Sequence, residues 1–346
     1  MKICVSQSVF RTLAMIVCLS ATGARAGVEE LTAPLVDKDS IPTVDGTVEA
    51  EEWQRGLSLH TGLVDARPKT LASQRVTVHM TAVKEALYVG LVSPKMADEL
   101  NTRDWERDDL DAALLDDRYE LVVKPPVTPP IPWYHIIVNS AGNIYDHKGD
   151  PHRSDVFKTY NMAEWNGEWT FKQNVTDDEW HMEFRIPVSM FGDQRTEAQG
   201  QWEINVGRGR RNGKHFIGLQ KNSADMARLR VVPDAPGLEL HQLGNLGAGE
   251  LDVVFKLEDP ALKGDGEGRT MSLTCVVRSE AGGGNLVREN ATIPVVPMGS
   301  EKTGGLTKSF TPGAKNTLML LLWDYALDAN AYLAKIYFEP EKKKGD

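Results

Sequence analysis

The sequence predicts an all-β fold, an antiparallel β-sandwich followed by a smaller immunoglobulin-like sandwich, and three observations predict it. Short runs rich in β-branched and aromatic residues recur along the chain, and Gly, Asn and Asp turn signals separate them. No segment has the sustained apolar periodicity of a long amphipathic helix. A stretch rich in Pro, Gly and polar residues, 233–249, divides the runs into two sets. We therefore expect packed sheets in each set.

The first set predicts the larger sandwich. We expect its strands at 76–80, 86–92, 119–124, 134–139, 180–186 and 201–207. Pro187 cannot donate a ladder hydrogen bond, so we expect it to end its strand and lead into a short segment, 188–191.

The second set has the spacing of an immunoglobulin-like sandwich. Its expected strands are 251–257, 270–278, 285–293, 317–323 and 332–338. The predicted organisation is a first domain at 27–232, a linker at 233–249 and a second domain at 250–346, which offers a docking surface for an extracellular partner.

The N-terminus has the pattern of a cleavable signal peptide. Lys2 and Arg11 precede or flank an apolar run of ten residues, and Ala24-Arg25-Ala26 predicts cleavage after Ala26. Ten apolar residues are too few to cross a hydrocarbon core of about 30 Å. We expect a secreted or periplasmic protein without a transmembrane anchor.

Charge and cysteine content narrow the function. Lys2, Arg11 and Arg25 leave with the signal, so 36 of the 39 basic residues and all 49 acidic residues remain, a formal charge of −13. This balance argues against a nucleic-acid partner, because phosphate binding needs a basic face. Cys275 is the one cysteine beyond residue 26, so no internal disulfide is expected and the core must hold the fold.

Nine short motifs follow one another in the first domain. They are 41–46 (IPTVDG), 51–53 (EEW), 86–89 (ALYV), 116–120 (DDRYE), 138–142 (VNSAG), 145–146 (YD), 165–169 (WNGEW), 180–187 (WHMEFRIP) and 205–208 (NVGR). The series resembles the family 9 carbohydrate-binding modules and the wider DOMON-like group of sandwich domains, over roughly residues 40–230. The resemblance implies a sandwich that holds a poly- or oligosaccharide on a concave sheet without cleaving it.

The resemblance also implies a set of polar ligand-binding residues. It assigns that role to Glu120, Asn139 and Arg208, and less directly to Asp117 and Arg210. Charged and amide groups suit the hydroxyl rim of a sugar. Strand alternation puts Glu120 on the face of Arg118, and Arg208 on the face of Arg210.

The aromatic part of the predicted site departs from the family. Leu114-Leu115 stands where family members often have a Trp before the paired aspartates, and Ile136-Ile137 replaces an expected arginine. We therefore expect Trp105 or Trp133 to supply the ring that stacks on the sugar.

The same motifs also have a structural explanation. Trp53, Tyr88, Trp180 and Phe184 lie in apolar segments, where large aromatics usually fill the space between sheets. Asp45-Gly46 fits a tight turn. The acidic loop 101–117 is a candidate site for structural calcium, although its spacing is not that of an EF-hand; no other cofactor is expected.

Three other functions stay open at this stage. A glycoside hydrolase would pair Glu120 with Glu183 or Asp146, but the sequence has no nucleophile elbow, zinc motif or phosphate loop to support an enzyme. A scaffold with a degenerate ligand site would pair Glu120, Asn139 and Arg208 only with each other. A haem-binding electron carrier would draw its two axial ligands from His135, His181, Met80, Met162 and Met182.

Overall fold

The computed structural model describes most of the chain after residue 26. The described residues are 27–60, 76–95, 100, 102–107, 110–126, 132–149, 165–192, 197–210, 215–220, 226–233, 235–259, 269–279, 284–294, 296–297 and 303–341. Within them no helix is long and apolar enough to cross a membrane.

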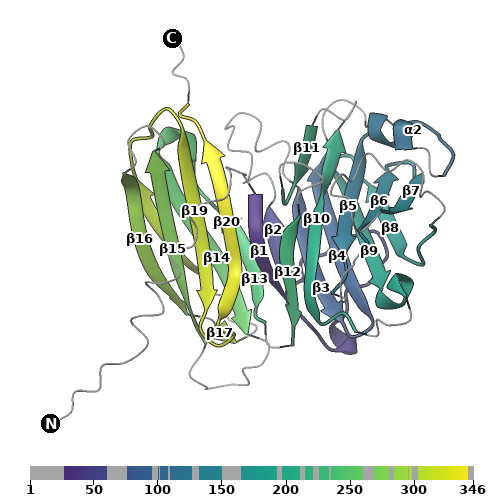
Figure 1. The fold of residues 1–346 in the computed structure, drawn as a ribbon, viewed down its shortest axis with the longest axis horizontal. Helices are drawn as coiled ribbons and strands as arrows, with labels where there is room; N and C mark the ends of the chain where they lie inside the picture. Colours follow the sequence, from purple (N-terminus) through teal and green to yellow (C-terminus); the bar gives the residue numbers. More distant parts are fainter. Residues whose placement is uncertain are drawn as a thin grey trace.

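Two large sheets face each other and form an all-β sandwich (Figure 1). Sheet A has the order β16-β15-β19-β20-β1-β12-β10-β5-β6-β7, with β11 paired to β10. Its strands are β1 (Gly27–Pro34), β5 (Arg118–Lys124), β6 (Tyr134–Asn139), β7 (Ile144–Lys148), β10 (Gly200–Arg210), β11 (His215–Gly218), β12 (Ala227–Val232), β15 (Thr270–Ser279), β16 (Asn285–Pro294), β19 (Asn316–Asp324) and β20 (Ala329–Phe338).

Sheet B has the order β17-β14-β13-β2-β3-β4-β9-β8, with β18 paired to β14. Its strands are β2 (Leu57–His60), β3 (Thr77–Val83), β4 (Ala86–Pro94), β8 (Thr170–Val175), β9 (Glu179–Pro187), β13 (Gly237–Gln242), β14 (Glu250–Asp259), β17 (Val296–Pro297) and β18 (Thr303–Ser309). The helical segments are η1 (Lys38–Ser40), α2 (Leu110–Leu115), η3 (Val188–Phe191) and η4 (Leu246–Ala248).

All eleven strands expected from the sequence form, and the segment after Pro187 is the 3-10 helix η3. The predicted all-β sandwich is confirmed, and its two sheets are mixed rather than antiparallel throughout. Strand β1 runs parallel to β12, β2 runs parallel to β13 and β14 runs parallel to β17.

The predicted linker contains strand β13, which is a correction to the sequence analysis. β13 pairs with β2 on one side and with β14 on the other, and its Leu238 and Leu240 are buried. In the same way β1 joins β12 to β20 in sheet A. The strands of residues 250–346 therefore extend the two sheets of the first half, and Figure 1 shows β1 and β13 between the two sets. An independent immunoglobulin-like domain stays a prediction.

Alternating residues from both sheets fill the space between them. Trp180 and Phe184 lie in this core, as expected, together with Trp202, Tyr119 and Tyr134. Burying each such ring removes roughly 150–250 Å² from water, so these residues stabilise the fold strongly. Cys275, the one cysteine in the described part of the chain, is free.

Trp53 and Tyr88 do not lie between the sheets, contrary to expectation. They form a separate cluster with Val83 and Ala86, on the opposite side of β4 from the core residues Leu87 and Val89. Alternation along β4 explains this, because the side chains of Ala86 and Tyr88 lie on the opposite face of the strand from those of Leu87 and Val89. The cluster covers the outer face of sheet B.

A buried carboxylate fastens the segment before β2 to that outer face. Glu183 Oε2 accepts hydrogen bonds from the backbone N–H groups of Asp45, at 3.0 Å, and Gly46, at 2.9 Å. Gly46 has a φ of 101°, which favours glycine. Three motifs of the ordered series, those holding Asp45-Gly46, Trp53 and Glu183, thus meet in one structural cluster.

Candidate functional site

The candidate site lies on the outer face of sheet A, over β5, β6 and β7. Along β5, Tyr119 and Leu121 face the core, so Arg118 and Glu120 face outward. The register adds Asn139 beside Arg118 and His135 beside Val122. On the next strand His147 is directly opposite His135, and Tyr145 is opposite Ile137. One face thereby collects these side chains: Arg118, Glu120, His135, Asn139, Tyr145 and His147.

The charged part of this face is a short row of buried groups. Arg118 Nη2 pairs with Glu120 Oε1, and His135 Nε2 lies 3.4 Å from Glu120 Oε2. A Cβ on Gly209, the β10 residue paired with Arg118, would lie 2.5 Å from the guanidinium carbon. Burial acts to raise the pKa of Glu120, but Arg118 and then His135 outweigh it and hold the pKa below its usual value. Glu120 is therefore a fixed anion.

The aromatic part continues from the charged row. The His147 ring stacks on Tyr145 at a centroid distance of 6.1 Å and lies 5.3 Å from the Trp133 ring. Trp133 packs on Val122 and Met226. Burial, and then the neighbouring His135, lower the pKa of His147, so His147 is neutral at pH 7.

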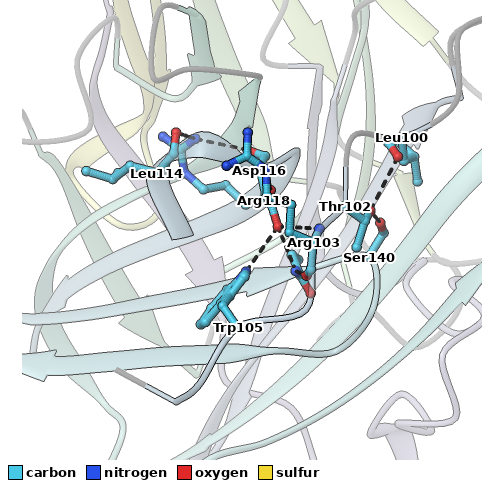
Figure 2. Close-up of polar contacts among 9 residues, drawn as sticks. Leu100, Thr102, Arg103, Trp105, Leu114, Asp116, Arg118 and Ser140 are labelled. Atoms are coloured by element: carbon cyan, nitrogen blue, oxygen red, sulfur yellow. Dashed lines mark hydrogen bonds and ion pairs between the residues drawn. The ribbon is translucent and has the colours of Figure 1, made fainter. Parts of the chain in front are cut away.

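The loop after residue 101 closes one end of the face through Asp116. The Asp116 carboxylate accepts hydrogen bonds from Trp105 Nε1 at 3.0 Å, Arg103 N at 2.9 Å and Asn139 Nδ2 at 3.0 Å. Figure 2 shows Trp105 and Arg103 converging on Asp116. The Trp105 ring packs against Ile137 among others. Trp105 and Asn139 are thus held by the loop and the strand end.

Arg208 lies on the other side of sheet A from Glu120. Gly207 pairs with Glu120 and Arg208 pairs with Tyr119, so the Arg208 side chain faces the interior. Arg208 Nη1 donates to Ser93 Oγ and to Pro94 O, each at 2.9 Å, and the guanidinium lies 5.6 Å from the Trp180 ring.

The structure therefore divides the residues predicted to bind ligand. It brings Glu120 and Asn139 to one face, but it groups Asp117 with Arg208, whose Nη2 lies 3.6 Å from Asp117 Oδ1. The expectation of a single polar trio is wrong in this respect. Arg210 ends β10, and its side chain lies outside the described residues.

Neither candidate stacking ring is an open plate. Trp105 is 8% exposed and Trp133 is 1% exposed. Trp133 nevertheless belongs to the outer-face cluster, and its Nε1 has no hydrogen-bond partner among the described residues. The same holds for His147 Nδ1.

The carboxylate pairs considered for hydrolysis do not form. Glu183 faces outward from sheet B, and Glu120 faces outward from sheet A, so the sandwich separates them. Asp146 pairs with the core-facing Ile136 and accepts from Trp169 Nε1 at 3.0 Å, so it too faces away from Glu120.

The named haem ligands are also dispersed. Met80 and Met182 lie in the core between the sheets, whereas His135 and His181 face outward from different sheets. Met162 lies outside the described residues.

Structural calcium in the acidic loop stays a prediction. The three donors named above all bind Oδ2 of Asp116, and no cluster of three or more His, Cys, Asp or Glu among the described residues fits a metal ion. Asp108 and Asp109, and the side chain of Asp111, lie outside the described part.

Arg118 and His147 belong to the site but are not among the residues predicted for it. Arg118 was visible from alternation, since it is two residues before Glu120. His147 required the register of the β6–β7 hairpin, which the turn at 139–143 sets and which alternation alone does not give.

Comparisons with known proteins assign no family to this chain. No family model matches the sequence, and no curated protein matches it. A candidate carbohydrate-binding protein from Bacteroides uniformis ATCC 8492 has 13% identity and a TM-score of 0.40, covering 59% of this chain and 100% of its own. A family 9 carbohydrate-binding module from Caldicellulosiruptor kristjanssonii, solved with cellotriose, has 13% identity and a TM-score of 0.35, covering 59% and 93%. Scores this low carry no information about a ligand for this chain.

Proposed function

We propose that the chain is an exported, non-catalytic carbohydrate-binding protein that holds a sugar on the outer face of sheet A. The observation that carries the proposal is the cluster of Trp133, Tyr145 and His147, in which two ring nitrogens have no partner among the described residues. An unsatisfied buried polar group costs about 1–3 kcal/mol, so native proteins rarely keep one without a reason. Bound sugar oxygens would supply the missing partners.

The residue types on this face suit a pyranose ring. Tryptophan and tyrosine rings pack on the apolar C–H face of a sugar, while ring nitrogens and Glu120 Oε2 bond its hydroxyl rim. Because Trp133 is nearly fully buried, ligand must displace whatever covers the ring. Binding is therefore expected to be slow as well as specific.

A binding role is favoured over hydrolysis by the state of the carboxylates. Hydrolysis of a glycosidic bond usually needs a protonated acid and a second carboxylate about 5–10 Å away. Glu120 is held ionised by Arg118, and Glu183 and Asp146 face away from it. Export is supported by the signal-peptide pattern of residues 1–26.

The test is a glycan array followed by calorimetry on residues 27–346. Trp133→Phe keeps an aromatic ring, although a smaller one, and removes the N–H; we expect it to weaken binding of any glycan that the wild type selects by about 5- to 30-fold. Trp53→Phe is the matched control, since Trp53 is a buried tryptophan on the outer face of sheet B, beside Glu183. Equal loss in both variants would indicate a general folding defect.

A scaffold without a ligand is the second candidate. It is favoured by the low exposure of Trp105 and Trp133 and by the internal hydrogen bonds of Asn139 and Arg208. This candidate predicts that the wild-type chain retains no glycan, and that Trp133→Phe changes only thermal stability.

A further inference from the structure

The two unpartnered nitrogens of the outer face can both donate a hydrogen bond, so both need an acceptor. Trp133 Nε1 can only donate a hydrogen bond, and His147 Nδ1 donates in one tautomer and in the protonated state. Their rings lie side by side, with centroids 5.3 Å apart. A group with two acceptor oxygens and no hydrogen of its own would satisfy both nitrogens at once.

The charged groups that face His147 are compatible with a bound anion. On β6 it faces His135, on β7 it stacks on Tyr145, and Glu120 on β5 is neutralised by Arg118. The buried carboxylate of this face, Glu120, pairs with Arg118 through Oε1, and its Oε2 lies 3.4 Å from His135 Nε2. The chain's overall negative charge acts against anions only weakly here, since physiological salt screens charges beyond about 8 Å.

We propose that the bound sugar carries an anionic substituent, a carboxylate or a sulfate, which accepts hydrogen bonds from Trp133 Nε1 and His147 Nδ1. This inference rests on the proposed function and specifies its ligand class. Arg118 and Glu120 form the buried ion pair beside the site and do not contact the anion. A neutral sugar can meet each nitrogen with a hydroxyl, but only the anion gains when His147 takes up a proton.

Proton uptake gives the proposal a signature that a structural role lacks. Burial and His135 lower the pKa of free His147, and a bound anion favours the protonated ring. Binding therefore takes up a proton and tightens as the pH falls from 8 toward 5.5. His147→Gln retains a side-chain donor but cannot ionise, so we expect it to bind with a flat pH profile.

The experiment is calorimetry of residues 27–346 with three oligosaccharide series matched in length: neutral, uronic-acid-containing and sulfated. We expect the anionic series to bind at least about tenfold tighter than the neutral one at pH 6, with proton uptake measured in two buffers. A preference for only one of the two anionic series identifies the substituent. Trp133→Phe should remove most of the preference, and Trp53→Phe should keep it. Near-ultraviolet circular dichroism checks that each variant is folded.

The outcomes separate this inference from the function on which it rests. Equal binding of neutral and anionic series, with no proton uptake, overturns the anionic ligand and leaves carbohydrate binding intact. Binding of none of the three series overturns both.

Discussion

The two outer faces of the sandwich each contain a buried glutamate and stabilise it with different partners. Each buries one glutamate almost completely, Glu120 on sheet A and Glu183 on sheet B. Glu120 is paired with a guanidinium and an imidazole, and its pKa is lowered. Glu183 receives backbone N–H groups from Asp45 and Gly46, and burial raises its pKa despite them.

The difference supports the outer face of sheet A as the proposed ligand face. On sheet B the carboxylate, the Asp45-Gly46 turn and the Trp53 ring hold one another, so the cluster serves to attach a chain segment. On sheet A the charges form a row from Arg118 to His135, and the row continues into rings with unused nitrogens. Fixed charges beside unused donors are typical of a binding site.

The largest effect is expected from removing the guanidinium on sheet A. Arg118→Met leaves Glu120 buried and uncompensated, which typically costs 3–5 kcal/mol, on the order of a third of a domain's stability. Urea unfolding of the variant measures the loss. Adding Glu120→Gln to Arg118→Met should recover much of it, because the unpaired charge is then gone. A double variant no more stable than the single one would show that the ion pair is not what holds this face.

The next effect compares one glycine from each face. A Cβ at Gly90 would lie 2.8 Å from the rigid Trp53 ring, whereas one at Gly209 would meet the end of the Arg118 side chain. Overpacking a buried site costs about 1–3 kcal/mol, and a rigid ring yields less than a side-chain tip. Thermal unfolding should therefore show a larger loss for Gly90→Ala than for Gly209→Ala. The reverse order would mean that the Arg118–Glu120 pair is the stiffer of the two clusters.

The strands of this fold were predictable because their pattern is local. In runs such as 134–139 successive side chains are buried on alternate faces of the sheet, and the resulting run of mostly apolar residues is recognisable in the sequence. Strand β8 was missed because as an edge strand it is largely exposed and polar. Strand β13 was missed because Pro and Gly around it conceal the alternation of Leu238 and Leu240.

The site was only partly predictable, because its geometry depends on register. Alternation predicts that Arg118 and Glu120 share a face, but whether Arg208 joins them depends on which β10 residue pairs with Glu120. A shift of one residue would have brought Arg208 to the outer face. The pairing of Gly207 with Glu120 instead turns Arg208 into the core, on the same face of β10 as the alternating apolar residues Trp202, Ile204 and Val206.

The smallest expected effect is on the pH dependence of stability, to which the two glutamates contribute with opposite signs. A lowered folded-state pKa means that Glu120 contributes stability above its unfolded value, near 4.5, and that this contribution is lost as the pH falls through the lower folded value. A raised pKa gives Glu183 the opposite behaviour: the folded state gains stability as the pH falls from the raised value toward 4.5.

The amide of Glu183→Gln imitates the protonated acid and still accepts from Gly46, so this variant should match or exceed the wild type at pH 7 and lose that advantage near pH 4. Glu120→Gln should instead be less stable than the wild type at pH 7, with the gap narrowing in acid. Urea midpoints measured for both variants between about pH 2.5 and 8 test this, and curves that shift in the same direction would show that the two carboxylates share one environment.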